Sequence, residues 1–274
     1  MGLLEGKVAI VSGAGSGVGR GIARAFAREG ASVVVADIDR SAAEVCVAEI
    51  RAELLGRAHP VIADVSDEAA VQRLMEETDN VFAGIDIVVN NAFRSSPYVL
   101  FEDKQLKDLQ QVIDVNLKGT WLMMRAALPY LRNRGGGRVI NLYSIDADVG
   151  AWLRSDYIAS KAAIRALTRA VAIEWARYGI LVNCLAPTAK GAGYQHMVEQ
   201  IPGFEQAAAD MNPCGRVGDP EEDIAPVAVF LASHMAKYVT GETIYVDGGL
   251  HITGYPSKPA VLPTAATAFS PGVA

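Results

Sequence analysis

The chain has 274 residues, of which 51% are hydrophobic and 20% charged, and it carries a net charge of −6. These values exclude a disordered chain, and because no basic cluster is present we expect neither nucleic acid nor an anionic membrane as a partner. No signal peptide or membrane-spanning run is visible, so we predict a cytoplasmic protein. Cys46, Cys184 and Cys214 are far apart without CxxC spacing, which favours reduced packing residues and no metal site.

A strand, a glycine loop and a helix are predicted at the start of the chain. The β-branched run at residues 7–12 is typical of a strand buried on both faces. A helix over residues 20–29 is predicted after the loop. Glycines let the backbone approach a pyrophosphate, and the free N–H groups of a helix N-terminus favour an anion. An ordinary strand-to-helix turn is the alternative. The candidate phosphate-binding residues are Gly13, Ser16, Gly17, Val18 and Gly19.

A second buried strand at residues 32–36 ends at Asp37. An acidic residue about 20 positions beyond such glycines accepts hydrogen bonds from the ribose hydroxyls and repels a 2′-phosphate. Ser16 and Ile38, which stand where a basic residue could bind that phosphate, are uncharged, although Arg40 is close. The pattern therefore indicates NAD and not NADP, unless Asp37 only caps a helix.

Helices and strands alternate along the rest of the chain. We predict helices at 41–55, 67–82, within 104–132, at 156–176 and at 220–233, and strands at 60–63, 85–89, 138–142, 180–185 and 242–246. This order predicts an α/β fold: a Rossmann-like, doubly wound, seven-stranded parallel sheet with helices on both faces. Residues 1–250 form one domain, with an irregular substrate lid at 188–217. The tail 251–274 is expected to be disordered or packed on a neighbouring subunit.

Tyr157 and Lys161 stand four positions apart in the alanine-rich helix predicted at 156–176. They therefore lie on one helix face. A phenol has a pKa of about 10, and a nearby ammonium group lowers it, which makes the phenol useful for proton transfer. The alternative is an interface aromatic beside a solvated lysine.

The chain resembles the short-chain dehydrogenase/reductase family over residues 5–250. The resemblance rests on SGAGSGVG at 12–19, ADV at 63–65, NNA at 90–92, the Asn of VNLKG at 116, Ser144 thirteen residues before Tyr157, the YxxxK motif, and VTGETIYVDGG at 239–249.

The resemblance implies a role for each of four catalytic residues. Tyr157 would be the general acid/base, and Lys161 would lower its pKa and hold the nicotinamide ribose. Ser144 would bind the substrate oxygen, and Asn116 would hold a water that links Lys161 to solvent. The hydride would pass directly between the nicotinamide and the substrate carbon. As alternatives, Asn116 braces a helix against a strand and Ser144 caps a helix.

The resemblance also implies cofactor contacts and an assembly. Asp64 and Val65 would contact the adenine, although Asp64 could be a turn residue, and Asn91 and Ala92 would contact the nicotinamide ribose. A homotetramer would form through the helices at 156–176 and 104–132 in one interface and through the last helix and strand in another.

The chain departs from the family pattern at the nicotinamide end of the site. Phe93 replaces the usual glycine after NNA. Pro187 is followed by Thr188 where the family has glycine, and Ala192 stands where a threonine usually binds the nicotinamide amide. Thr188 is the available substitute.

Apolar and aromatic side chains dominate the expected substrate pocket, whose candidates are Phe93, Ile145, Trp152, Tyr194 and Met197. They favour a hydrophobic cyclic alcohol such as a steroid, terpenoid or aryl carbinol. Asp146, Asp148, Arg154 and His196 keep a sugar or polyol open. A 3-oxoacyl-thioester reductase and a non-catalytic NAD-binding scaffold are further alternatives. Asp37 argues against that reductase, and the presence of all four catalytic residues argues against the scaffold.

Overall fold

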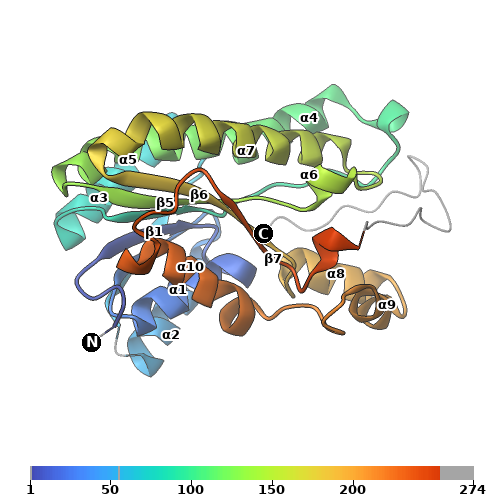
Figure 1. Ribbon diagram of the computed structural model, residues 1–274, viewed down its shortest axis with the longest axis horizontal. Coiled ribbons are helices and arrows are strands. Elements are labelled where there is room, and N and C mark those ends of the chain that lie inside the picture. Colours follow the sequence, from blue (N-terminus) through green and yellow to red (C-terminus); the bar gives the residue numbers. More distant parts are fainter. Residues whose placement is uncertain (1, 55, 254–274) are drawn as a thin grey trace.

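The computed structural model describes residues 2–54 and 56–253. Its seven strands form one parallel sheet in the order β3-β2-β1-β4-β5-β6-β7, which confirms the predicted fold class (Figure 1). The strands are β1 (Val8–Ser12), β2 (Ser32–Asp37), β3 (Ala58–Ile62), β4 (Ile87–Asn90), β5 (Gly137–Leu142), β6 (Ile180–Pro187) and β7 (Thr243–Val246).

Helices cover both faces of this sheet (Figure 1). One face carries α1 (Gly17–Arg28), α2 (Arg40–Glu53) and α10 (Ala225–Ala232). The other carries α3 (Glu68–Phe82), α4 (Leu106–Ile113), α5 (Gly119–Asn133), the short α6 (Asp146–Val149) and α7 (Ser155–Trp175). The remaining helices are α8 (Ala192–Gln200) and α9 (Phe204–Met211).

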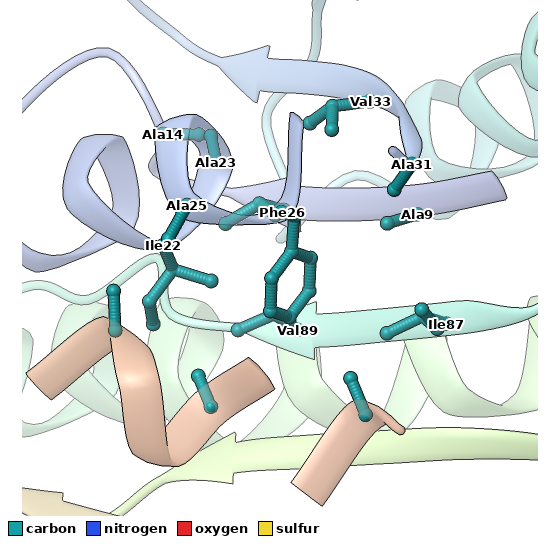
Figure 2. Close-up of a cluster of buried hydrophobic side chains, with 14 of the residues drawn as sticks. Ala9, Ala14, Ile22, Ala23, Ala25, Phe26, Ala31, Val33, Ile87 and Val89 are labelled. Carbon is teal, nitrogen blue, oxygen red and sulfur yellow. The ribbon is translucent and has the colours of Figure 1, made fainter. Parts of the chain in front are cut away.

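Alternate residues of the inner strands β1, β2, β4 and β5 enter two separate hydrophobic cores. In β1, Ala9 and Val11 pack in the core with α1, whereas Ile10 packs in the core with α3 and α5. Figure 2 shows the first core, in which the ring of Phe26 points from α1 toward Val89 of β4. Because both faces are buried, the strands have continuous apolar runs and no polar alternation.

The strand order reverses direction at β1, which pairs with β2 on one side and β4 on the other. A crevice forms outside the carboxyl ends of the strands at such a switch point, and ligands bind there in doubly wound folds. The loops after β1 and β4 carry the glycines and Asn91 to this edge, and Asp37 is the last residue of β2.

Three details differ from the sequence-based expectations. Segment 188–217 is not irregular, because α8 and α9 form within it, separated by Pro202 and Gly203. A π-helical turn, Asp114–Lys118, interrupts the predicted long helix, and another, Pro220–Ile224, precedes α10. Cys46 and Cys184 are buried as expected, but Cys214 is exposed and does not pack in the core.

Most of the expected tail, residues 254–274, lies outside the described residues. Within the described ranges, no helix is both long and apolar enough to cross a membrane.

Candidate active site

The loop after β1 is closed so tightly that only glycine fits at key positions. Gly13 has a φ of 61°, and a Cβ on it would lie 2.8 Å from Cα of Ala92. A Cβ on Gly19 would lie 2.2 Å from the Gly13 carbonyl oxygen. The Asn91 side-chain amide donates to that same oxygen at 2.9 Å. Asn91 thus fixes the loop against the end of β4.

The N-terminus of α1 faces the same region and has unused donors. Ser16 is its N-cap residue, but the Ser16 side chain makes no capping hydrogen bond. The first-turn N–H groups of a helix have no partners within the helix, so they can bind an anion. Gly17 and Val18 begin the helix. Together with Gly13 and Ser16 they line a cavity of about 190 Å³, named the main cavity for its place at the switch point, since other cavities are larger.

Asp37 lies at the far end of this crevice, in a second cavity of about 80 Å³. Its side chain accepts hydrogen bonds from the backbone N–H groups of Gly15 at 2.8 Å and Asp39 at 3.0 Å. Asp39 caps α2 by accepting from Ala42, so Asp37 is not the helix cap that was the alternative. The residues lining this cavity include Asp37, Ile38, Asp64, Val65, Ala92 and Phe93.

Asp64 also has the structural role considered for it. Its carboxylate accepts from the backbone N–H of Ser66 at 2.9 Å and from the Ser66 hydroxyl at 2.7 Å. Asp64 therefore both stabilises this turn and lines the second cavity.

The main cavity of about 190 Å³ brings three of the four predicted catalytic residues together: Ser144, Tyr157 and Lys161. Ser144 follows β5, whereas Tyr157 and Lys161 come from the first two turns of α7. All three residues are buried, with exposed fractions of 9%, 8% and 3%. The Lys161 ammonium donates to the Leu142 carbonyl oxygen at 2.7 Å.

Burial dominates the ionisation of both α7 residues. It raises the pKa of Tyr157, against which a nearby Arg154 guanidinium and a hydrogen bond from Ser144 lower it. The same burial lowers the pKa of Lys161 to about 8. The expectation that Lys161 leaves Tyr157 with a lowered pKa is thus not met, because desolvation outweighs the nearby charges.

Asn116 lies in the π-helical turn and serves as a brace. Its side chain accepts from the Arg94 N–H at 2.7 Å and donates to the Arg94 carbonyl at 3.1 Å and to the Ser160 hydroxyl at 3.0 Å. Asn116 therefore acts as a brace, but it links the segment after β4 to α7 and not a helix to a strand. The water relay remains a prediction.

Two of the five expected substrate-pocket residues line the main cavity: Phe93 and Tyr194. Phe93 packs edge-on against Tyr157 with ring centres 6.3 Å apart, and Phe93 has no positive φ, so replacing the family glycine costs no backbone strain there. The structure does not place Ile145, Trp152 or Met197 in the cavity wall. Ile145 is buried at the start of α6, and the Trp152 side chain is 40% exposed.

The end of β6 departs from expectation. Pro187 lines the main cavity, but Thr188 lies in a different cavity beside β7 and donates its N–H to the Val246 carbonyl at 3.0 Å. The contact of Thr188 with the nicotinamide amide remains a prediction. Leu142, Tyr143, Gly191 and Gly193 line the main cavity without having been predicted. The position of Tyr143 directly before Ser144 at a strand end was the available signal.

A glycine cradle at the switch point, with Ser, Tyr and Lys around one cavity, defines an oxidoreductase that uses a nicotinamide dinucleotide. The crevice fits such a cofactor, because it has an uncapped helix N-terminus and a carboxylate at its far end. No group of His, Cys, Asp and Glu that could hold a metal ion occurs among the described residues.

Comparisons with known proteins also indicate an oxidoreductase. The family model described as Enoyl-(Acyl carrier protein) reductase matches residues 13–251. The chain is 36% identical to the (2S)-[(R)-hydroxy(phenyl)methyl]succinyl-CoA dehydrogenase subunit BbsD of Thauera aromatica, covering 90% of this chain and 97% of that protein. It is 35% identical to L-fucose dehydrogenase of Bos taurus, covering 94% and 96%.

A solved short-chain type dehydrogenase/reductase from Mycobacterium marinum is similar in structure, with a TM-score of 0.83 and 33% identity over 90% of this chain and 96% of that one. The chain belongs to the short-chain dehydrogenase/reductase family.

Proposed function

We propose that the protein is an NAD-dependent oxidoreductase that interconverts a secondary alcohol and a ketone. The observation that carries this proposal is the convergence of Ser144, Tyr157 and Lys161 on the cavity that begins at the glycine loop. A phenol, a hydroxyl and an ammonium at one site suit proton transfer to and from a substrate oxygen.

The chain's own residues would handle the proton. In oxidation, Tyr157 takes the hydroxyl proton of the alcohol while Ser144 donates a hydrogen bond to the same oxygen. The nicotinamide ring, when bound, supplies the hydride acceptor. Lys161 exchanges its bond to Leu142 for the ribose hydroxyls, and Asn116 supports proton exit toward solvent. In reduction, Tyr157 returns the proton to the oxygen of the newly formed alcohol.

NAD is preferred over NADP in this proposal because Asp37 is buried at the cavity where the adenosine ribose would bind. A carboxylate there accepts hydrogen bonds from two ribose hydroxyls and repels a 2′-phosphate. Ile38 beside it offers no positive charge. Asp64 and Val65 would contact the adenine, and Asn91 and Ala92 the nicotinamide ribose.

The substrate we propose is a hydrophobic cyclic alcohol. Phe93 and Tyr194 give the main cavity two aromatic walls, and Phe93 lies against the reacting Tyr157. A relative named for a hydroxy(phenyl)methyl compound fits an aryl carbinol. The second candidate is a sugar or polyol, favoured by the charged Arg154 and Asp146 near Tyr157 and by the L-fucose dehydrogenase relative.

A homotetramer is also proposed. Apolar side chains are exposed on the helices of the expected interface, with Trp121 of α5 at 53% and Ile173 of α7 at 81%. Beyond α10, Met235 and Tyr238 are exposed at 65% and 99%. Exposed apolar side chains of this size are typical of association surfaces when they gather in patches.

The test is NADH formation from NAD with a panel of secondary alcohols that sets aryl and alicyclic rings beside sugars and polyols, repeated with NADP. Ring alcohols should react with NAD alone. Tyr157→Phe should abolish turnover and leave NADH binding, measured by calorimetry, nearly unchanged. Activity surviving in Tyr157→Phe would contradict the mechanism, and turnover of polyols alone would favour the second candidate.

A further inference from the structure

Arg154 places a second cation against the proposed general acid/base. Its guanidinium carbon lies 4.1 Å from the centre of the Tyr157 ring and 5.4 Å from that of Tyr98. The Lys161 ammonium is farther from the Tyr157 ring centre, at 5.7 Å. Of these two cations, Arg154 is therefore the closer to the ring.

The backbone before Arg154 adopts a conformation that a leucine rarely takes. Leu153 has a φ of 67°, in the left-handed region, and directly precedes Arg154. The Arg154 carbonyl then accepts the Ile158 N–H at 2.9 Å and starts α7. Strained backbone of this kind persists where the surroundings impose it, and it clusters at functional sites. Here it brings the arginine onto the tyrosine three residues further along.

Asp146 holds the guanidinium in place. Arg154 forms an ion pair with the Asp146 carboxylate, and the two side chains are 24% and 10% exposed. The Asp146 N–H donates to the Ser144 hydroxyl oxygen at 3.3 Å. The pair therefore links the residue over the Tyr157 ring to the residue that would bind the substrate oxygen. Ion pairs that are mostly buried are screened little by salt.

The charged and polar groups around Tyr157 come from every element that packs on it: Lys161 and Asp156 of α7, Arg154 before it, Asp146 of α6, Ser144 after β5, and Tyr98 after β4. Lys104 neutralises Asp156. Burial raises the pKa of Tyr157. Of the nearby charges, Arg154 has the largest effect and lowers this pKa, whereas the Asp146 carboxylate raises it. Lys161 has a pKa of about 8 and loses its charge in alkaline solution, whereas arginine stays charged.

We propose that Arg154 is a positioning residue for Tyr157, which fixes the ring under its guanidinium and favours the phenolate that accepts the substrate proton in oxidation. The inference rests on the proposed role of Tyr157 as the base. It adds a residue outside the Ser, Tyr and Lys set, three positions before the tyrosine.

Ionisation of Tyr157 can be measured without a substrate. The ultraviolet difference spectrum between each protein and its own Tyr157→Phe version reports tyrosinate at this one position. Removing the cation in Arg154→Gln should raise the pKa of Tyr157 by about one unit. At any pH below the wild-type pKa, the fraction of Tyr157 present as phenolate should then fall by about tenfold. Arg154→Lys should recover most of the shift. Circular dichroism at each pH would check that every variant is folded.

Arg165→Gln is the matched control. Arg165 places its guanidinium 5.0 Å from the centre of the Tyr143 ring and pairs with Asp148, so it repeats the arrangement beside a different tyrosine. It should leave the Tyr157 titration unchanged. If Arg154→Gln proves unstable because Asp146 loses its partner, the double variant Asp146→Asn with Arg154→Gln removes both charges. It should still raise the pKa of Tyr157, but by less than Arg154→Gln alone, because Asp146 acts against Arg154.

Equal titration of Tyr157 in the wild type and in Arg154→Gln would overturn the inference. So would a loss of oxidation rate in Arg154→Gln that is the same at all pH values, because the expected loss of about tenfold at neutral pH disappears as the pH rises. If the wild type oxidises no alcohol but Arg154→Gln still raises the pKa of Tyr157, the proposed function is contradicted while the effect of Arg154 on Tyr157 stands.

Discussion

The Lys104 ammonium lies 2.9 Å from the carboxylate of Asp156, the residue directly before Tyr157. The two side chains of this ion pair are only 8% and 3% exposed. Lys104 also donates to the Pro97 carbonyl at 2.8 Å, and the Ser96 hydroxyl donates to Asp156. The pair fastens the segment after β4, which carries Phe93, to the start of α7. Two walls of the cavity are thereby held at a fixed separation.

Asp156→Asn should lower the free energy of unfolding by about 3–5 kcal/mol, because it leaves a buried ammonium without a carboxylate. Burial alone would raise the pKa of Asp156, but hydrogen bonds from Ser96 and Lys104 outweigh it and lower the pKa. The stabilisation is therefore present above about pH 4 and lost as the pH falls toward the folded-state pKa. Urea unfolding across this range measures both effects. The exposed Asp79→Asn is the control, expected within about 0.5 kcal/mol of wild type.

Lys161→Met should raise the free energy of unfolding, which is the opposite effect to that of Asp156→Asn. In the part of the chain that the structure describes, no carboxylate forms an ion pair with Lys161, and burial lowers its pKa to about 8. The folded state then binds fewer protons than the unfolded state above that pH, so the lysine costs stability at neutral pH and less as the pH rises to about 10. The variant should gain about 1–3 kcal/mol at pH 7 while losing turnover. A loss of stability like that expected for Asp156→Asn would contradict this.

Asp37→Asn combined with Ile38→Arg should shift cofactor preference toward NADP. The amide removes the charge that repels a 2′-phosphate while keeping one oxygen for the Gly15 N–H, and Ile38 is 57% exposed at the cavity edge where a guanidinium could bind the phosphate. Calorimetry with NADH and NADPH gives the ratio of dissociation constants. Ile38→Arg alone is the control, and an unchanged ratio in the double variant would mean that Asp37 does not select the cofactor.

Phe93→Gly should change relative rates across the alcohol panel, with bulky ring substrates affected most. The ring that lies 6.3 Å from that of Tyr157 is removed, and the cavity widens beside the reacting oxygen. We expect a change of about tenfold in relative kcat/KM for apolar rings, corresponding to one lost apolar contact surface. Proportional losses for all substrates would show that Phe93 does not shape specificity.

Trp121→Glu and Ile173→Glu should each dissociate the proposed tetramer. A charge on a surface buried by association costs several kcal/mol unless it is paired. Sedimentation velocity gives the oligomeric state, with the exposed Glu68→Gln on α3 as the control. A wild type that sediments as a monomer would contradict the assembly itself.

Much of the fold was predictable because parallel strands buried on both faces appear in the sequence as continuous apolar runs. The runs at 7–12 and 32–36 match β1 and β2 to within one residue. The helices α8 and α9 were missed because glycine and proline occur at the ends of short helices as often as within loops. Here these residues are Gly191, Gly193, Pro202 and Gly203. The π-helical turn at Asn116 has no sequence signature, since it changes only the hydrogen-bond partner along the helix.

The shared helix face of Tyr157 and Lys161, the residues proposed as catalytic, was predictable from their spacing, since residues four apart are neighbours on a helix. The pocket walls were not, because they depend on where loops turn. Trp152 and Leu153 stand between Ser144 and Tyr157 in sequence, yet the left-handed Leu153 directs the next residue, Arg154, to the tyrosine. Likewise, the pKa of Tyr157 depends on how deeply the folded chain buries the side chain, which no local sequence pattern predicts.

The uneven exposure of the three cysteines equips the natural chain with a ready labelling site. Burial raises the pKa of Cys46 to about 12 and also raises that of Cys184, so neither thiol forms the reactive thiolate in the folded protein. Cys214 is exposed at the end of segment 188–217, whose first residues line the main cavity. A thiol-reactive fluorophore would therefore attach at one position, and its emission could follow ligand entry in real time without any engineered substitution.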